Sequence, residues 1–173
     1  MKMALATTHI ALKEVPETID SGLLIETIEI IEKDMQVFFD LKKPTIGVLG
    51  LNPHAGEEGL LGKEELLIIE PTIEYLRKKN KNIIGPISAD TAFLQNLDLD
   101  IILALYHDQG LPLFKFVNPH QAANVTLGLP IIRTSVDHGI ALDLTASNNV
   151  NNESLHYALM TAKKMYQSYA EKN

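Results

Sequence analysis

The sequence predicts an α/β protein with a mainly parallel sheet and flanking helices. Two observations lead to this class. Short runs of consecutive apolar residues alternate with longer stretches in which apolar residues recur every three or four positions. The short runs are apolar throughout, as strands buried on both faces of a parallel sheet are. Strands that alternate with helices in this way are typical of α/β domains.

The first half of the chain contains two predicted helical stretches around one strand. An amphipathic helix is predicted from Ser21 to Asp40, because its apolar residues lie at steps of three and four. A buried strand follows over Thr45 to Leu51. The second helical stretch runs from Lys63 to Lys79. Pro71 should kink it or begin a new helix, since proline has no amide donor.

The second half of the chain is predicted to hold the remaining strands and a closing helix. The strands are expected over Asn82 to Ile87, Asp100 to Tyr106, Asn124 to Leu127 and Ile131 to Val136, and the helix over Glu153 to Tyr169. Gln109-Gly110 is expected to turn the chain sharply after the second of these strands.

The composition excludes several kinds of partner and chemistry. A net charge of -7 argues against nucleic acid or an anionic membrane as a partner, because phosphate groups require clustered Lys and Arg. No apolar run approaches the roughly 20 residues of a membrane span. The chain has no cysteine, which rules out disulfides and thiolate metal ligands and fits a reducing cytoplasm. We therefore expect a soluble, unexported, cytoplasmic protein.

Three of the six histidines each follow a predicted apolar strand. His9 follows the run that begins at Met3, His54 follows the strand from Thr45, and His107 follows the strand from Asp100. The carboxyl ends of neighbouring parallel strands lie side by side, so residues just after them converge on one crevice. Three imidazoles there could share one divalent metal and leave a position open for a substrate oxygen. Each histidine alone is more typical of an ordinary polar loop residue or of a satisfied histidine at the edge of a core, and it is the repetition at three strand ends that favours a metal site.

Other polar residues offer weaker indications of a site. The stretch Ala55 to Gly62 is rich in glycine, so its backbone could approach a ligand closely, although ordinary turns share this composition. Asp108 could orient an imidazole or accept a proton, or it could cap a helix. Lys115, Asn124 and Arg133 could together bind a phosphate or carboxylate, although most such cations are simply solvated. No G-x-G-x-x-G motif supports a Rossmann nucleotide site.

The chain resembles the 4-hydroxythreonine-4-phosphate dehydrogenase family of pyridoxal phosphate biosynthesis. The matching motifs occur in the family's order along nearly the whole chain. They are Leu5-Ala-Thr-Thr-His9, Gly50-Leu-Asn-Pro-His-Ala-Gly-Glu57, Gly85-Pro86 with Ala89-Asp90-Thr91, Tyr106-His-Asp-Gln-Gly-Leu-Pro112, Asn124-Val-Thr-Leu-Gly-Leu-Pro130 and Ile132-Arg-Thr-Ser-Val-Asp-His-Gly139. Only the family's amino-terminal half has no counterpart in this chain.

The resemblance implies an architecture like that of isocitrate and isopropylmalate dehydrogenases. It also implies a homodimer with a shared site, in which His9 and His54 bind a divalent metal and His107 is supplied by a second copy of the chain. The metal would be zinc, with magnesium or cobalt as alternatives. Residues 1–135 would form the metal-binding, substrate-binding and dimer-forming domain, and residues 136–173 part of a nucleotide-side domain.

The implied reaction is oxidation of 4-hydroxythreonine-4-phosphate by NAD or NADP, followed by loss of carbon dioxide to leave an aminoketone phosphate. By resemblance, Lys115, Asn124, Arg133 and Asp90 bind the substrate. His138 lies near the nucleotide, and Asp108 or Lys115 handles the proton.

The sequence departs from the family near the implied nucleotide site. Where the family usually has Thr-Ala, this chain has Ile140-Ala141, and Thr145 to Val150 replaces an Ala- and Gly-rich segment. This difference bears on nucleotide binding more than on metal binding. Two alternatives stay open: a related dehydrogenase of threonate or erythronate 4-phosphate, and a non-catalytic metal-binding dimerisation module.

Overall fold

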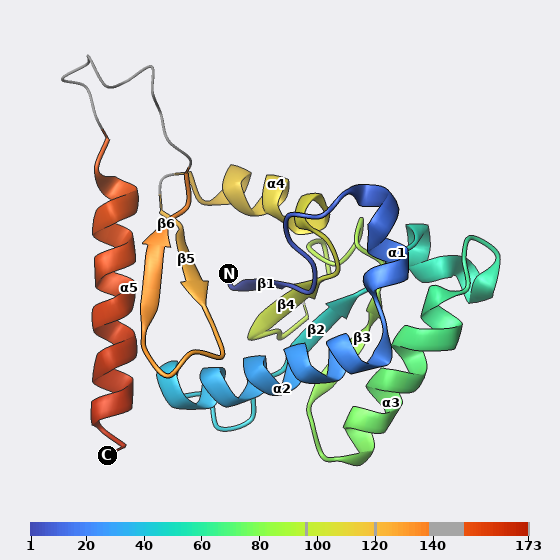
Figure 1. Ribbon diagram of the computed structural model, residues 1–173, viewed down its shortest axis with the longest axis horizontal. Coiled ribbons are helices and arrows are strands. Elements are labelled where there is room, and N and C mark those ends of the chain that lie inside the picture. Colours follow the sequence, from blue (N-terminus) through green and yellow to red (C-terminus); the bar gives the residue numbers. More distant parts are fainter. Residues whose placement is uncertain (96, 120, 139–150, 173) are drawn as a thin grey trace.

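A parallel four-stranded sheet forms the centre of the computed structural model, which describes residues 1–95, 97–119, 121–138 and 151–172 (Figure 1). Its strands are β1 (Met3–Leu5), β2 (Ile46–Leu49), β3 (Ile83–Ile87) and β4 (Ile101–Ala104). They lie side by side in the order β1-β4-β2-β3. All residues of β2 and β4 are buried, which confirms the prediction of strands covered on both faces.

The helices are α1 (Val15–Thr18), α2 (Ser21–Phe38), α3 (Glu70–Lys78), α4 (His107–Val117) and α5 (Glu153–Ala170). The first three cover one face of the sheet, α4 contacts β1 and β4, and α5 packs on α2 and on an antiparallel hairpin. Buried residues of α1, α2 and α3 form one core with Val48 and Leu103. A smaller core on the other face contains Leu49 and Ala104. Successive side chains of a strand point to opposite faces of the sheet, so neighbouring strand residues belong to two separate cores.

The predicted helices over residues 21–40 and 63–79 are confirmed, with one refinement. Asp20 caps α2 by accepting a hydrogen bond from the Leu23 amide at 2.7 Å. The second stretch is divided into a wide helical turn, Glu65–Ile69, and α3. Pro71 lies in the first turn of α3, directly after the wide helical turn, so its missing N–H falls where the two helical segments join.

The predicted sharp turn at Gln109-Gly110 is wrong, because both residues lie inside α4. Gly110 is buried where the helix crosses the sheet. A Cβ atom at this position would lie 2.2 Å from Met3 Sδ and 3.3 Å from Ala104 Cβ. Here glycine serves close packing of α4 on β1 and β4, rather than a change in chain direction.

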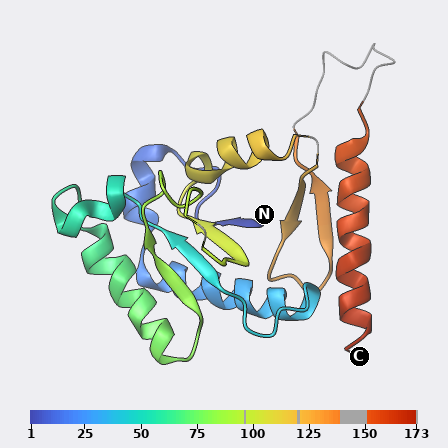
Figure 2. The same cartoon turned by 180° about the vertical axis from the view of Figure 1, so that it is seen from behind.

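A separate antiparallel hairpin accounts for the last two predicted strands. It consists of β5 (Ala123–Thr126) and β6 (Arg133–Val136), and it lies beside the parallel sheet with α5 against it (Figures 1 and 2). The Thr134 hydroxyl donates to the Ala158 carbonyl of α5 at 3.1 Å. The first four strands thus form a wholly parallel sheet, and β5 and β6 form a second, two-stranded antiparallel sheet.

A buried carboxylate ties the hairpin to the main body. Asp34 of α2 is 4% exposed, and its Oδ2 accepts a hydrogen bond of 2.6 Å from the Gly128 amide in the connection between β5 and β6. This contact spans 94 positions of sequence, so it fixes the hairpin relative to α2.

The Asp34 contact predicts a loss of stability on mutation. We expect Asp34→Ala to lower the free energy of unfolding by about 1–3 kcal/mol, because it leaves the amide without its partner and a small void in the core. Urea unfolding measures this change. Glu26→Ala, at an exposed position of the same helix, is the matched control and should change stability much less. Equal effects of both substitutions would contradict the anchoring role.

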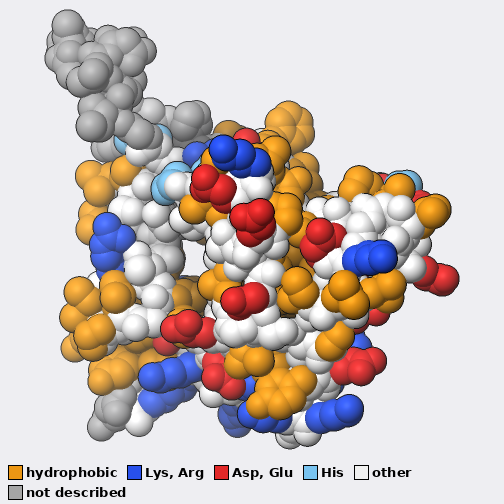
Figure 3. All heavy atoms as spheres, turned by 45° about the vertical axis from the view of Figure 1, so that its right-hand side comes forward, with side chains coloured by type: hydrophobic (Ala, Val, Ile, Leu, Met, Phe, Trp, Pro, Cys, Tyr) orange, Lys and Arg blue, Asp and Glu red, His pale blue; other side chains and the backbone are white. Residues whose placement is uncertain are grey.

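The surface carries mixed charge. On the face drawn in Figure 3, acidic and basic side chains are interspersed with apolar ones. No helix in the described ranges is long and apolar enough to cross a membrane.

Candidate functional site

The three strands that precede the candidate histidines are immediate neighbours in the sheet, in the order β1-β4-β2. His9 follows β1, His107 begins α4 just after β4, and His54 follows β2. The topology therefore places all three at the carboxyl edge of one sheet, as the sequence argument expected.

Two of these histidines lie together. The ring centres of His9 and His107 are 5.6 Å apart, with the planes inclined at 44°. Two imidazoles bound to one tetrahedral zinc ion have ring centres about 5 Å apart, given Zn–N distances of about 2.1 Å. The His9–His107 spacing is therefore close to that of two ligands of one metal, whereas the resemblance implied that His107 completes the site of a second copy. His54 is not part of this pair, and in the described ranges no three His, Asp or Glu side chains are grouped to hold a metal.

Carboxylates orient two of the three imidazoles. His54 Nδ1 contacts Glu57 Oε1, and His107 Nδ1 lies 2.6 Å from Asp108 Oδ1. The hydrogen bond from His54 to Glu57 raises the pKa of the imidazole above its usual value. A carboxylate on one ring nitrogen leaves the other, Nε2, for a metal, which is the common arrangement around bound zinc.

Sequence reasoning singled out Asp108 but not Glu57. The signal for Glu57 was its position three residues after His54 in a short loop. The contact of Glu57 with His54 occurs within the backbone turn of residues 53–59, whose conformation the residue types alone did not indicate.

His54 is presented by a left-handed turn. Within the turn Pro53–Gly59, the five residues from His54 to Glu58 all have positive φ, between 43° and 82°. Left-handed backbone costs roughly 1–2 kcal/mol for a residue with a side chain, and only Gly56 in this run avoids that cost. The expected glycine-rich loop is present, but its non-glycine residues share the strained conformation.

Asp90 lies beside His54. Its Oδ2 is 4.0 Å from His54 Nε2, and its Oδ1 accepts a hydrogen bond of 2.5 Å from the Ser88 hydroxyl. The Ser88 hydrogen bond lowers the pKa of Asp90, with a smaller contribution from His54. Asp90 is therefore a carboxylate at neutral pH next to one candidate metal ligand.

Lys115 lies at the far end of α4 from His107. It follows Asp108 by seven residues, so it is on the same side of the helix about 10 Å further along. Its Nζ donates to the Asp137 carbonyl at 2.9 Å and lies 3.4 Å from Asp137 Oδ1. His138 directly follows Asp137 in the sequence. These contacts bring the end of α4 to the end of β6.

Asn124 and Arg133 lie on one face of the hairpin. Asn124 pairs with Ser135, and Thr126 pairs with Arg133. Directly paired residues share a face, so these four polar side chains point away from the face that Thr134 presents to α5. The Arg133 guanidinium donates from Nη1 to the Thr126 hydroxyl at 2.7 Å. Sequence analysis found the amide and the cation but missed the two hydroxyls.

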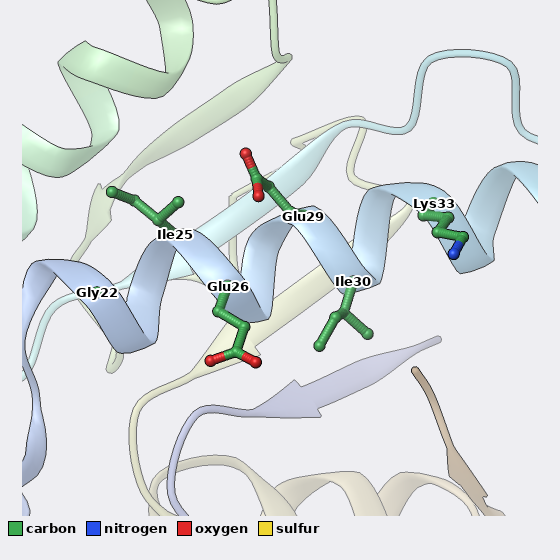
Figure 4. A pocket seen from close by; sticks show the side chains of 6 residues that line it. All are labelled: Gly22, Ile25, Glu26, Glu29, Ile30 and Lys33. Atoms are coloured by element: carbon green, nitrogen blue, oxygen red, sulfur yellow. The ribbon is translucent and has the colours of Figure 1, made fainter. Parts of the chain in front are cut away.

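Two surface grooves lie elsewhere. One, of about 340 Å³, runs along α2, where its lining side chains project from a single helix (Figure 4). It is lined by Gly22, Ile25, Glu26, Glu29, Ile30 and Lys33. The other, of about 300 Å³, is lined by Gln121, Asn152, Glu153, His156 and Tyr157. Neither contains a candidate site residue, so both are separate from the histidine edge.

Comparison with known proteins supplies the family. The model of the family described as "Pyridoxal phosphate biosynthetic protein PdxA" matches residues 1–162. The chain belongs to the PdxA family. Among curated members, 4-hydroxythreonine-4-phosphate dehydrogenase of Ectopseudomonas mendocina is 53% identical over 95% of this chain and 50% of its own length. The enzyme of that name from Saccharophagus degradans is 47% identical over 100% of this chain and 52% of its own.

Solved PdxA structures share the fold. The crystal structure of 4-hydroxythreonine-4-phosphate dehydrogenase from Klebsiella pneumoniae matches with a TM-score of 0.82 and 34% identity, over 96% of this chain and 50% of that one. A terephthalate 1,2-cis-dihydrodiol dehydrogenase from Burkholderia xenovorans matches with a TM-score of 0.75 and 28% identity, over 92% of this chain and 52% of that one. The chain spans about half the length of the PdxA relatives it matches.

The segments that depart from the PdxA pattern, Ile140-Ala141 and Thr145 to Val150, lie outside the described residues. The structure therefore describes the residues predicted to bind metal and phosphate, and the prediction for the nucleotide side remains untested.

Proposed function

We propose that this chain forms the metal- and phosphate-binding half of a dehydrogenase that uses NAD or NADP to oxidise 4-hydroxythreonine-4-phosphate. The observation that carries the proposal is the pair of histidine rings 5.6 Å apart at the carboxyl edge of the sheet. Membership of the PdxA family supplies the substrate class. The chain accounts for about half of its relatives' length, so the activity of the whole enzyme is part of the proposal.

His9, His54 and His107 would hold the metal. Their donor set is neutral imidazole, which suits zinc and cobalt and makes magnesium the weaker candidate. Assembly of the trio requires His54 to approach the other two, or one histidine to come from a second copy of the chain in a homodimer. When bound, the metal supplies a Lewis acid next to the oxygens of the substrate.

Lys115, Asn124 and Arg133 would bind the phosphorylated substrate. A guanidinium and an ammonium provide charge-assisted hydrogen bonds to phosphate oxygens, and the amide adds a neutral donor. The shared hairpin face of Asn124 and Arg133 and the contact of Lys115 with Asp137 support a common binding surface. Asp90 would bind the amino or hydroxyl end of the substrate, close to His54.

The reaction consists of two steps. In the first, a base would take the proton of the secondary alcohol, and the nicotinamide, when bound, would supply the hydride acceptor, so that a 3-oxo acid would result. In the second, the carbon–carboxylate bond breaks, carbon dioxide leaves, and the carbon that retains the electron pair is protonated. Asp108 or Lys115 would take and return the proton. His138, next to the Lys115 contact with Asp137, would lie on the nucleotide side.

Several finer assignments belong to the same proposal. They are the isocitrate and isopropylmalate dehydrogenase-like architecture, the division into residues 1–135 and 136–173, and a cytoplasmic location. Contacts of α5 with α2 and with the hairpin would form the junction between the two parts.

A related substrate is the main alternative. Threonate or erythronate 4-phosphate would need the same cations, so the phosphate residues do not separate these substrates. The dihydrodiol dehydrogenase relative shows that a similar fold accompanies another named activity. The half-length match also keeps open a non-catalytic metal-binding dimerisation module.

A turnover assay tests the function. The zinc-loaded chain, alone and mixed with the remaining half of a PdxA relative, is given each candidate substrate with NAD or NADP. We expect reduced nicotinamide to form with 4-hydroxythreonine-4-phosphate when both halves are present. Preference for another phosphorylated acid would replace the substrate assignment. No turnover by the mixture, with zinc bound and the halves associated, would favour the non-catalytic module.

A further inference from the structure

Glu65 is a buried carboxylate in contact with the chain that leads into the left-handed turn. It is 1% exposed and begins the wide helical turn before α3. Its Oε1 accepts hydrogen bonds from the amides of Leu51 and Asn52, both at 2.7 Å. Its Oε2 accepts from Asn52 Nδ2 at 2.8 Å. None of the ion pairs in the described ranges involves Glu65, and these three N–H donors satisfy its two buried oxygens.

The left-handed turn folds back over this carboxylate. A Cβ atom on Gly56 would lie 2.7 Å from Glu65 Oε2. A Cβ atom on Gly50 would lie 2.7 Å from Ala55 Cα and 3.3 Å from Glu65 Oε1. Glycine at both positions lets the backbone approach Glu65 this closely, and a strained turn persists only where its surroundings hold it.

The same segment is held from its other side by α4. Gln109 Nε2 donates to the Gly50 carbonyl at 2.5 Å, and Gln109 Oε1 accepts from the Leu105 amide at 2.7 Å. The Gly50–Asn52 segment is therefore hydrogen-bonded on one side to α4, the helix that carries His107, and on the other side to the carboxylate of Glu65. This connection fixes where His54 is presented relative to His107.

We propose that Glu65 is a positioning residue for the candidate metal site. Its carboxylate holds the amides of Leu51 and Asn52, and through them the left-handed turn that presents His54 and Glu57. The link to metal binding rests on the proposed function. The hydrogen bonds by which Glu65 holds the turn do not depend on it. This buried carboxylate acts through the backbone amides and does not contact the three candidate histidines in the described hydrogen bonds.

Glu65→Gln tests the proposal, because it keeps the size of the side chain and removes its charge. Amide hydrogen exchange and zinc affinity are both measured. We expect the amides of Leu51 and Asn52 to exchange at least about 10-fold faster, with no change for core amides such as Leu103. Zinc affinity should fall about 10- to 100-fold, the usual effect of losing a group that supports a metal ligand. Glu74→Gln, at an exposed position of α3, is the matched control.

The outcomes separate positioning from bulk stability. Unchanged exchange and zinc affinity in Glu65→Gln would overturn the proposal. Faster exchange of all amides with unaltered zinc affinity would also overturn it, since the role would then be structural only. If wild-type protein binds no zinc but the amides of Leu51 and Asn52 are released selectively, the positioning role stands and the proposed function fails.

A second variant covers the case in which Glu65→Gln does not fold. Asn52→Ala deletes one of the three contacts to Glu65, together with the hydrogen bond from Asn52 Nδ2 to Glu64 Oε2 at 2.7 Å, and keeps both backbone amides bonded to Glu65. It should loosen the turn and weaken zinc binding in the same sense but by less. Zinc affinity equal to that of wild type would count against the proposal.

Discussion

Replacing His107 or His54 with alanine is expected to abolish stoichiometric zinc binding by the chain. A zinc site needs at least three protein ligands to hold the ion firmly, and the candidate set contains three imidazoles. Loss of one leaves two, so we expect the zinc content after dialysis to fall from about one ion per chain, or per shared site, to nearly none. Metal analysis of the purified variants measures this directly.

The matched control for these variants is His156→Ala. His156 is exposed on α5, away from the carboxyl edge of the sheet, so its loss should leave zinc content unchanged. Zinc retained in both His107→Ala and His54→Ala would show that the ion binds elsewhere. Zinc lost equally in His156→Ala would show nonspecific binding to surface histidines.

Replacing Arg133 with alanine is expected to weaken binding of the phosphorylated substrate about 10- to 100-fold. A hydrogen bond to a charged group is worth about 1.5–3 kcal/mol, which corresponds to this range of affinity. Arg133→Lys should recover only part of the loss, because the ammonium cannot form the paired contacts of a guanidinium. Titration calorimetry with 4-hydroxythreonine-4-phosphate measures the affinities.

Two comparisons make the Arg133 result specific. Lys164→Ala removes a positive charge from the exposed surface of α5 and should have little effect. The unphosphorylated 4-hydroxythreonine should bind wild type and Arg133→Ala equally weakly. An equal loss for both ligands would mean that Arg133 does not recognise the phosphate.

The sequence predicted the parallel sheet well because its signal is local. Buried strands such as those over Ile46–Leu49 and Ile101–Ala104 are short apolar runs, and burial on both faces follows from that pattern alone. Each histidine comes just after a strand in the sequence, so the parallel topology places all three at one edge of the sheet. The closing helix and α2 were predicted within a few residues for the same reason.

The features that sequence analysis missed depend on contacts between distant segments. Gly110 lies within a helix because Met3 and Ala104 pack against it, although glycine usually favours turns. The left-handed conformation from His54 to Glu58 lies against Glu65, a residue beyond the turn whose carboxylate binds the preceding Leu51 amide. Hydrophobic periodicity carries no information about such contacts, so neither feature could be read from local pattern.

The candidate site was likewise predictable in part. Residue types and strand ends singled out the three histidines. Residue types also suggested Lys115, Asn124 and Arg133, and the family resemblance then favoured them as substrate-binding residues. The structure then placed Asn124 and Arg133 on one face of the hairpin, which the strand pairing explains. Glu57, Thr126 and Ser135 were missed, since each takes its place from a turn geometry or a strand register.

The most direct test of the central claim is a crystal structure of the zinc-loaded chain with anomalous scattering measured at the zinc edge. The account predicts one strong peak at the carboxyl edge of the sheet, bonded to imidazole nitrogens of His9, His54 and His107 from one copy or two. A peak bonded to other residues, or no peak in crystals grown with excess zinc, would contradict the three-histidine site.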